Sequence, residues 1–339
     1  MSTLDPTPPP IEAIKRAAES LSGDVIRSAL LPLPPGHVQR RLPESKILLK
    51  LEAQQATGSF KVRSAVLWAR SLDASTRARG LVAVSAGNHA MAVAYAATCT
   101  DTTATVVMPR TADPMRVAGA RQLGAEVILT PDVHAAFARV EEIVSAEGRT
   151  FVHPFEGPRV ALGVGTIGLE LIEQCPALDA VVVPIGGGGL CAGIAAAVRQ
   201  LKPEIEVFGV EPEGADSMHR SFAAGKPASI GAVRTIADSL GAPHAAPYSF
   251  ALCRDNVDQL VKVNDDDLQR AMAALLADAC LAVEPAGAAA TAAAWGPLRE
   301  RLAGKTVALI VCGGNVGIEN YTRFIKRGQE LLEPLEPVH

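Results

Sequence analysis

Short apolar runs alternate with alanine-rich segments of helical length along nearly the whole chain, and this alternation restricts the fold more than any other feature. The apolar runs are bounded by turn residues and span Lys46–Leu51, Gly80–Val84, Thr103–Met108, Glu126–Leu129, Ala180–Ile185, Val207–Val210 and Thr306–Val311. The segments of helical length include His89–Thr98, Met115–Leu123, Val133–Ala146, Gly189–Gln200 and Asp265–Ala279. Continuously apolar strands that alternate with helices indicate parallel sheets covered by helices on both faces.

The chain has 339 residues, which is more than one domain usually holds. The stretch Leu81–Leu129 is compact enough to form a lobe of its own, and Pro154, Gly157 and Pro158 interrupt the pattern just after it. We therefore predict an α/β fold of two lobes, each with a mostly parallel twisted sheet covered by helices. The predicted domains are a small domain of residues 69–156 and a discontinuous large domain of residues 1–68 and 157–339.

Charge and cysteine usage exclude several classes of partner. The net charge is −4, and no stretch concentrates Lys and Arg as binding to nucleic acid or to an anionic membrane would require. No apolar stretch is long enough to cross a bilayer, and the N-terminus lacks the features of a secretory signal. The six cysteines are far apart and never form C-x-x-C, so we expect reduced thiols in a cytoplasmic protein.

The first motif with chemical potential is Thr57-Gly58-Ser59-Phe60-Lys61, which follows one predicted strand and opens a helix. Lys61 could be an ordinary solvated lysine in a first helical turn. It could instead form a Schiff base, which requires a partly desolvated amine that can lose its proton and attack an aldehyde. Phe60 would then cover a flat heteroaromatic ring.

The second motif, Ser85-Ala86-Gly87-Asn88-His89, lies where a strand gives way to a helix. A helix N-terminus presents main-chain N–H groups and a positive dipole end, which suits a carboxylate. Asn88 adds an amide that can bond a phenolate oxygen. Ser85 or Asn88 could also be no more than a helix cap.

Two further motifs follow strands of the predicted large domain. Gly186-Gly187-Gly188-Gly189-Leu190 separates a strand from a helix, and four glycines let main-chain amides surround an anion such as a phosphate. A flexible turn is the alternative. Cys312 in Cys312-Gly313-Gly314-Asn315 ends the last strand and is either a buried small residue or a weak donor to a ring nitrogen. A lysine, a phosphate loop, an amide and a weak donor together describe a site for pyridoxal phosphate in the cleft between the lobes.

These motifs resemble those of the serine/threonine dehydratase and serine racemase family, the fold type II or tryptophan-synthase-β type of pyridoxal-phosphate enzymes. The resemblance also includes Gly209-Val210-Glu211-Pro212 and Val283-Glu284-Pro285-Ala286-Gly287, and it extends from about Ile11 to Asn320. It implies that Lys61 carries the cofactor as a Schiff base, that Phe60 packs on its ring and that Asn88 bonds its phenolic oxygen. It further implies that Gly186–Gly189 and Leu190 hold the phosphate and that Cys312 faces the ring nitrogen.

The resemblance also implies the substrate site and the reaction. The loop Ser85, Ala86, Gly87, Asn88 and His89 would bind the substrate carboxylate, and Lys61 and Ser85 would be catalytic. The implied reaction is removal of water and then ammonia from a small β-hydroxy amino acid such as L-threonine or L-serine, in amino-acid catabolism. We expect a homodimer.

Two departures from the family narrow this interpretation. Racemases of the family have a serine where this chain has Ala86, and alanine cannot move a proton, so efficient racemisation is not expected. The family's cation site corresponds to Glu211, Ala215 and Ser217, and a serine at the third position favours a monovalent or weakly held cation over a tightly bound divalent one.

Three alternatives stay open from the sequence. The enzyme could be specialised for another 3-hydroxy amino acid, such as phenylserine or hydroxyaspartate, although no arginine is clearly placed to bind a second carboxylate. It could be a β-replacement synthase of the cysteine-synthase kind. It could also be a non-catalytic pyridoxal-phosphate-binding protein, although a carboxylate site beside Lys61 argues for catalysis.

Overall fold

Two sheets organise the computed structural model, which describes residues 6–333. The larger sheet has the strand order β1 (Leu30–Pro32), β2 (Lys46–Lys50), β10 (Thr306–Ile310), β7 (Ala180–Pro184), β8 (Glu206–Pro212) and β9 (Gln259–Val263). Only β1 runs antiparallel to its neighbour; every other pair is parallel. The smaller sheet is entirely parallel, in the order β5 (Glu126–Thr130), β4 (Ala104–Pro109), β3 (Leu81–Val84) and β6 (Thr150–Phe151).

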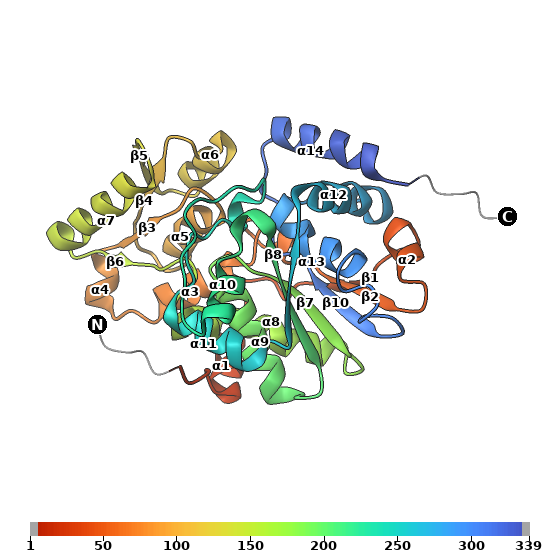
Figure 1. Cartoon of the computed structure of the whole chain (residues 1–339). Coiled ribbons are helices and arrows are strands. Elements are labelled where there is room, and N and C mark those ends of the chain that lie inside the picture. The colour runs from red at the N-terminus through yellow and green to blue at the C-terminus, as the bar shows by residue number, and fades with distance from the viewer. Residues whose placement is uncertain (1–5, 334–339) are drawn as a thin grey trace.

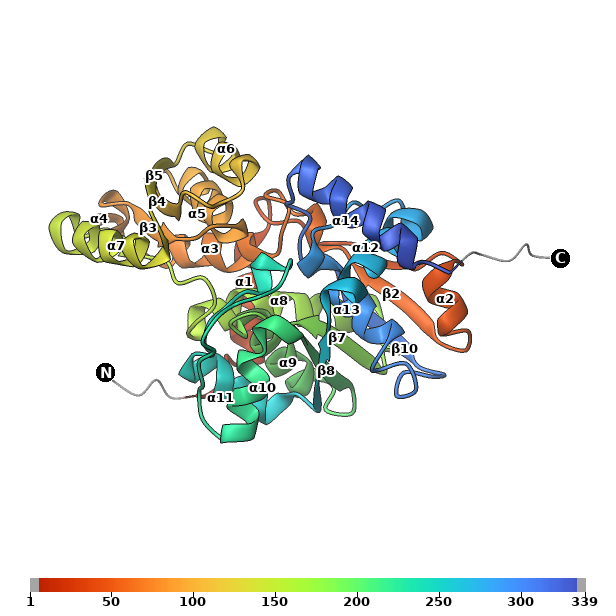
Figure 2. The ribbon, with the colours of Figure 1, turned by 45° about the horizontal axis from the view of Figure 1, so that its top comes forward.

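Helices cover both sheets, and Figure 1 shows the smaller sheet with its helices as a separate lobe. The helices of that lobe are α4 (Ala74–Ala78), α5 (Asn88–Cys99), α6 (Pro114–Gln122) and α7 (Val133–Glu147). The other helices are α1 (Ile11–Leu21), α2 (His37–Arg41), α3 (Lys61–Arg70), α8 (Pro158–Gln174), α9 (Gly189–Leu201), α10 (Ser217–Ala224), α11 (Pro247–Asn256), α12 (Asp265–Ala279), α13 (Pro285–Trp295) and α14 (Ile318–Leu331). In Figure 2, α8 and α9 lie on one side of the larger sheet, and α12 and α13 lie on the other.

The predicted α/β fold with two mostly parallel sheets is confirmed. All seven predicted strands are present, and β1, β6 and β9 are additional. The division into domains at residues 68 and 156 stays a prediction, and its first boundary falls within α3, which packs on both α5 and α8. All six cysteines are free.

Helix α8 is the main element that the strand and helix pattern does not reveal. It is 17 residues long, begins with Pro158 and contains glycines that lower helix propensity. A Cβ at Gly163 would lie 2.6 Å from Cα of Ser64 in α3, and one at Gly168 would lie 2.8 Å from Cβ of Ala197 in α9. The glycines therefore let α3 and α9 approach α8 closely, and this packing stabilises a helix whose sequence is locally unfavourable.

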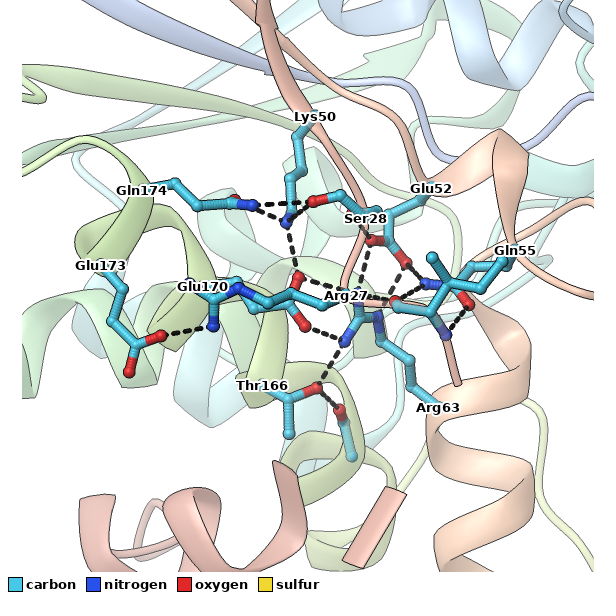
Figure 3. Close-up of polar contacts among 12 residues, drawn as sticks. Arg27, Ser28, Lys50, Glu52, Gln55, Arg63, Thr166, Glu170, Glu173 and Gln174 are labelled. Atoms are coloured by element: carbon cyan, nitrogen blue, oxygen red, sulfur yellow. Dashed lines mark hydrogen bonds and ion pairs between the residues drawn. The ribbon is translucent and has the colours of Figure 1, made fainter. Parts of the chain in front are cut away.

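A buried charge cluster fixes α3 against the large lobe (Figure 3). Arg63 binds both carboxylate oxygens of Glu52 at 2.8 Å and also contacts Glu170 at 2.7 and 3.0 Å. Lys50 donates to Glu170 at 2.5 Å, so two cations balance two carboxylates. These four residues are at most 5% exposed. Because Arg63 lies two residues after Lys61, the cluster also holds the start of α3 in place.

Candidate active site

One cavity of about 260 Å³ lies where residues of both lobes meet. It is bounded by the residues that follow β3 and β7, together with the start of α3 and the residue after Val311. The sequence-predicted residues that line it are Phe60, Lys61, Ser85, Ala86, Gly87, Asn88, His89, Gly186, Gly187, Gly188, Gly189, Leu190 and Cys312. The four motifs therefore meet in one place, as the sequence predicts.

Lys61 is the first residue of α3, and it is partly buried instead of fully solvated. Its Nζ donates to the main-chain oxygen of Pro154 at 2.5 Å and lies 4.9 Å from the centre of the Phe60 ring. Burial lowers the pKa of Lys61 to about 8, and Cys312 and Glu284 oppose this change only in part. The fraction of this amine that is unprotonated at neutral pH is therefore far larger than for a solvated lysine, and the unprotonated amine is the form that attacks an aldehyde.

The Ser85 loop crosses from β3 to α5, and neither Ser85 nor Asn88 caps the helix. Asn88 is the first residue of α5, and the Ser85 hydroxyl accepts a bond from Gly87 N at 3.0 Å. The hydroxyl hydrogen of Ser85 stays available to a ligand. The His89 side chain points elsewhere, because its Nε2 bonds the Val152 oxygen at 2.8 Å and burial lowers its pKa to about 3. The His89 side chain therefore does not serve a carboxylate, whereas the main-chain N–H groups at this helix start can.

The glycine loop leads from β7 into α9 and is tightly enclosed. A Cβ at Gly187 would lie 2.3 Å from the Phe155 ring, and one at Gly189 would lie 2.4 Å from the Phe155 main-chain oxygen. Gly188 has a left-handed backbone with φ of +95°. A flexible turn does not need such close contacts. The loop is instead a fixed strand-to-helix connection whose first helical N–H groups have no intrahelical acceptor.

The segment that encloses the glycine loop is itself fixed. The His153 Nδ1 accepts bonds from the main-chain N–H groups of Phe155 and Glu156 at 3.3 and 3.0 Å. The Glu156 carboxylate accepts from the first turn of α11, and the Ser249 hydroxyl donates to the Phe155 oxygen at 2.8 Å. Phe155 is thus held over the loop and cannot retreat easily from an added side chain.

Cys312 lies beside the start of α3, because its main-chain oxygen accepts a bond from Phe60 N at 3.1 Å. Its thiol donates to the Ala286 oxygen at 3.3 Å. Burial raises the pKa of the Cys312 thiol well above its ordinary value, so the thiol is neutral. It suits a weak hydrogen-bonding partner and not a thiolate nucleophile.

A polar network around Asn88 was not predicted from the sequence. Asn88 Nδ2 donates to the Glu284 carboxylate at 2.7 Å, and its Oδ1 accepts from Asn315 Nδ2 at 2.8 Å. Arg116 then binds Glu284 at 2.9 Å and Asp238 at 2.5 Å. Glu284 and Asn315 stand in motifs that carry the family resemblance. Arg116 gives no such signal, because an arginine in a predicted helix usually points to solvent.

The predicted cation-binding residues lie between the end of β8 and the start of α10, but Glu211 already has several donors. Its two carboxylate oxygens accept from the main-chain N–H groups of Met218 and His219 at 2.8 Å, and from His219 Nδ1 at 2.7 Å. Ala215 precedes α10 and Ser217 begins it. Among residues 6–333, no cluster of three or more His, Cys, Asp or Glu side chains is arranged for a metal ion. A cation at Glu211, Ala215 and Ser217 stays a prediction.

The cavity suits pyridoxal phosphate. A side chain at either Gly187 or Gly189 would meet Phe155, so the narrow glycine loop can approach an anion only through main-chain amides. The amine of Lys61 is desolvated and the thiol of Cys312 is neutral, as an aldehyde and a weakly basic ring nitrogen require. Phe60 is buried beside the lysine and offers an apolar surface for the ring.

Comparison with known proteins shows the family of the chain. Residues 22–313 match the family model described as "Pyridoxal-phosphate dependent enzyme", and the chain belongs to this family. It is 53% identical over 287 residues to the phenylserine dehydratase of Ralstonia pickettii, covering 85% of this chain and 88% of that protein. It is 39% identical over 319 residues to the L-threonine ammonia-lyase of Thermotoga maritima, covering 94% and 78% of the two chains.

Similar solved structures show to which branch of the family the chain belongs. The structure of maize serine racemase superimposes with a TM-score of 0.87 at 30% identity, covering 97% of this chain and 99% of the other. Together with the ammonia-lyases, this places the chain in the serine/threonine dehydratase and serine racemase branch of the fold type II enzymes. The resemblance predicted from the motifs is confirmed.

Proposed function

We propose that this protein is a pyridoxal-phosphate-dependent dehydratase that converts an aryl-substituted 3-hydroxy amino acid, of the phenylserine kind, to a 2-oxo acid and ammonia. The observation that carries the proposal is the convergence of Lys61, the Ser85 loop and the glycine loop on a cavity whose remaining wall is largely apolar. The apolar lining comprises Val84, Pro109, Val133, Phe137, Phe155, Leu240, Ala242 and Pro243.

The residues of the chain have distinct parts in this reaction. Main-chain N–H groups at the start of α5 bind the substrate carboxylate, and the Lys61 amine removes the proton from Cα. The hydroxyl of Ser85 donates a proton to the departing β-hydroxyl, which leaves as water, and Ser85 then regains a proton from solvent. Bound pyridoxal phosphate supplies the conjugated ring that withdraws electrons from Cα. The released enamine hydrolyses in water to a 2-oxo acid and ammonia.

The apolar wall favours an aryl substituent over the methyl group of threonine. Val133 and Phe137 of α7 are 46% and 45% exposed and line the cavity, so a substrate ring can remove further apolar surface from water. Arg116 is the cavity-lining arginine among residues 6–333, and Glu284 and Asp238 already neutralise it. A second substrate carboxylate, as in hydroxyaspartate, therefore finds no free arginine there.

A panel of substrates tests the proposal. Holoenzyme is assayed with L-threo-phenylserine, L-threonine, L-serine and L-threo-3-hydroxyaspartate for 2-oxo acid and ammonia. We expect kcat/KM for phenylserine to exceed that for threonine by about tenfold or more, since burying a few further carbon atoms contributes at least about 1.4 kcal/mol. A higher kcat/KM with threonine than with phenylserine would overturn the preference for an aryl substrate, but not the assignment as a dehydratase. No release of ammonia from any of them, with activity only when sulfide is added, would favour the β-replacement alternative.

A pair of variants on one helix tests the role of the apolar wall. Phe137→Ala removes a ring from the cavity, whereas Val144→Ala removes exposed apolar surface of α7 that does not line it. We expect Phe137→Ala to raise KM for phenylserine and to leave threonine kinetics nearly unchanged, and Val144→Ala to change neither. Equal losses with both substrates would mean that Phe137 does not contact the aryl group.

Stereochemistry provides a separate prediction. Ala86 lies where racemases of the family have a serine, and it cannot return a proton to the face of Cα opposite Lys61. We expect elimination with little racemisation, so chiral chromatography of unreacted substrate during turnover should show little of the opposite enantiomer. Inversion at a rate comparable to elimination would show that another residue protonates that face.

Assembly and location belong to the same proposal. A small amino acid as substrate is what the relatives of the family suggest. No helix among residues 6–333 is long and apolar enough to cross a membrane. We propose a homodimer in the cytoplasm. Light scattering of the purified holoenzyme would test the dimer, with a monomer as the contrary result.

A further inference from the structure

Helix α6 of the small lobe sends one buried side chain into the large lobe. Arg116 is 2% exposed and spans the boundary between the two lobes at the edge of the cavity. Its Nη1 and Nη2 bind Asp238 at 2.5 and 3.1 Å, and Nη2 also binds Glu284 at 2.9 Å. Its Nε and Nη2 donate to the Asn315 main-chain oxygen at 3.0 and 2.7 Å. Nη2 has two hydrogens and so shares one of them between two of its three acceptors. A planar guanidinium can face Asp238, Glu284 and Asn315 together in this way, whereas a lysine lacks the planar fork.

Arg116 contacts the two residues, Glu284 and Asn315, that make the short hydrogen bonds to the Asn88 amide. Glu284 accepts from Asn88 Nδ2, and Asn315 donates to Asn88 Oδ1. The amide has two N–H hydrogens: the first makes the short bond to Glu284, and the second makes only a long bond of 3.4 Å to the Ser239 hydroxyl, which a ligand in the cavity can replace. We propose that Arg116 is a positioning residue, which directs the Asn88 amide at the cofactor by holding its two partners, Glu284 and Asn315.

The electrostatics of Glu284 support this arrangement. Burial raises the pKa of Glu284 to about 7, although Arg116 and the Asn88 amide lower it. Burial also disfavours the charge of Arg116, but Glu284 and Asp238 outweigh it and raise the pKa of Arg116 above its ordinary value. Without Arg116, Glu284 would lose the charge that balances it and would be largely protonated. A neutral carboxyl is a weaker acceptor for Asn88, so the amide would be less well fixed.

The inference rests on the cofactor lying in this cavity and not on the identity of the substrate. A change in the donor to the phenolic oxygen alters the electronic state of the bound cofactor, which its absorption bands report. The spectrum therefore tests the inference independently of turnover, and it can be measured even if the preferred substrate is not an aryl amino acid.

The experiment compares holoenzymes carrying Arg116→Met, Arg116→Lys and Asp113→Ala. Met keeps much of the arginine's apolar length without its charge, and Lys keeps the charge without the planar fork. Asp113 is the matched control: it lies on the same inter-lobe connection, capping α6 through Met115 N and accepting from Gly317 N in the large lobe. It makes no bond to Asn88, Glu284 or Asn315 that would orient the amide.

We expect Arg116→Met to change the ratio of the cofactor's absorption bands and to lower kcat by about ten- to a hundredfold, with a smaller change in KM. Arg116→Lys should restore part of both, whereas Asp113→Ala should lower the unfolding midpoint and leave the spectrum as in the wild type. An unchanged spectrum in Arg116→Met overturns the inference. If Arg116→Met fails to fold, an unchanged spectrum in Arg116→Lys overturns the inference instead. Equal spectral changes in Asp113→Ala would also overturn it, because Arg116 would then act only by joining the lobes.

Discussion

The buried surroundings of Lys61 favour its unprotonated amine, and this gives a pH prediction. Since burial lowers its pKa to about 8, apoenzyme should capture pyridoxal phosphate at a rate that rises with pH up to about 8 and then levels off. The sign follows from the neutral amine being the attacking form, whose fraction grows about tenfold per pH unit below the pKa. Stopped-flow absorbance of apoenzyme mixed with cofactor measures this rate.

Borohydride reduction supplies the control for that measurement. Reduced holoenzyme should carry the cofactor covalently on Lys61, and Lys61→Ala should carry none. A reduced adduct on Lys50 or Lys46 would contradict the assignment. Lys50 is a sensitive comparison, because it is fully buried and already bonded to Glu170, Ser28 and Gln174.

Cys312 gives a second prediction at the level of one residue. Its thiol is neutral and donates to the Ala286 oxygen, so the hydroxyl in Cys312→Ser can make the same bond. We expect Cys312→Ser to lower kcat by less than about tenfold, equivalent to about 1.4 kcal/mol in the activation free energy. A loss of several orders of magnitude with an unchanged cofactor spectrum would show that the sulfur has a covalent role.

Among the elements, the glycine loop is the one whose shape is most directly testable. Gly189→Ala places a Cβ against the Phe155 main-chain oxygen, which cannot move aside as a side chain can. We expect cofactor binding to weaken by about tenfold or more, which corresponds to about 1.4 kcal/mol. Equilibrium titration of apoenzyme with pyridoxal phosphate measures this change. Gly231→Ala is the control, because its Cβ meets nothing within 4 Å, and an equal loss there would remove the argument from Phe155.

The sequence predicts strands better than helices in this chain, for a physical reason. Buried strands such as Ala180–Pro184 are continuous apolar runs, and the pattern needs no partner to be recognised. Helix α8 instead depends on its partners: Gly163 and Gly168 oppose a helix locally and favour one only when α3 and α9 are packed against them. The short strands β1 and β6 likewise exist because a neighbouring strand pairs with them.

The site divides in the same way. The convergence of motif residues such as Lys61 and the glycine loop on one cavity could be predicted, because each motif consists of adjacent residues at the end of a predicted strand or the start of a helix. The Arg116 network could not, since it joins residues more than a hundred positions apart in the sequence. The role of Arg116 depends on its burial, and a single sequence does not indicate whether an arginine is buried.

At the scale of the whole molecule, the buried cluster around Arg63 joins elements distant in the chain. Arg63→Met leaves Glu52 and Glu170 with Lys50 as their only strong cation in the cluster, and we expect the free energy of unfolding to fall by about 3–5 kcal/mol. Arg27→Met is the control, because its ion pair with Glu173 is about half exposed and should contribute at most about 1 kcal/mol. Urea titration of both variants measures the difference, and similar small losses would contradict a structural role for the cluster.

The glycines of α8 have a consequence for the dimensions of the cofactor site. Lys61 begins α3 and the glycine loop begins α9, and α8 lies in contact with both helices. The thickness of α8 therefore sets how far Lys61, the proposed covalent anchor, lies from the main-chain amides proposed to bind the phosphate, while the length of the cofactor is fixed by its bonds. A methyl group added at Gly163, far from any reacting atom, would change a distance to which the ligand cannot adjust.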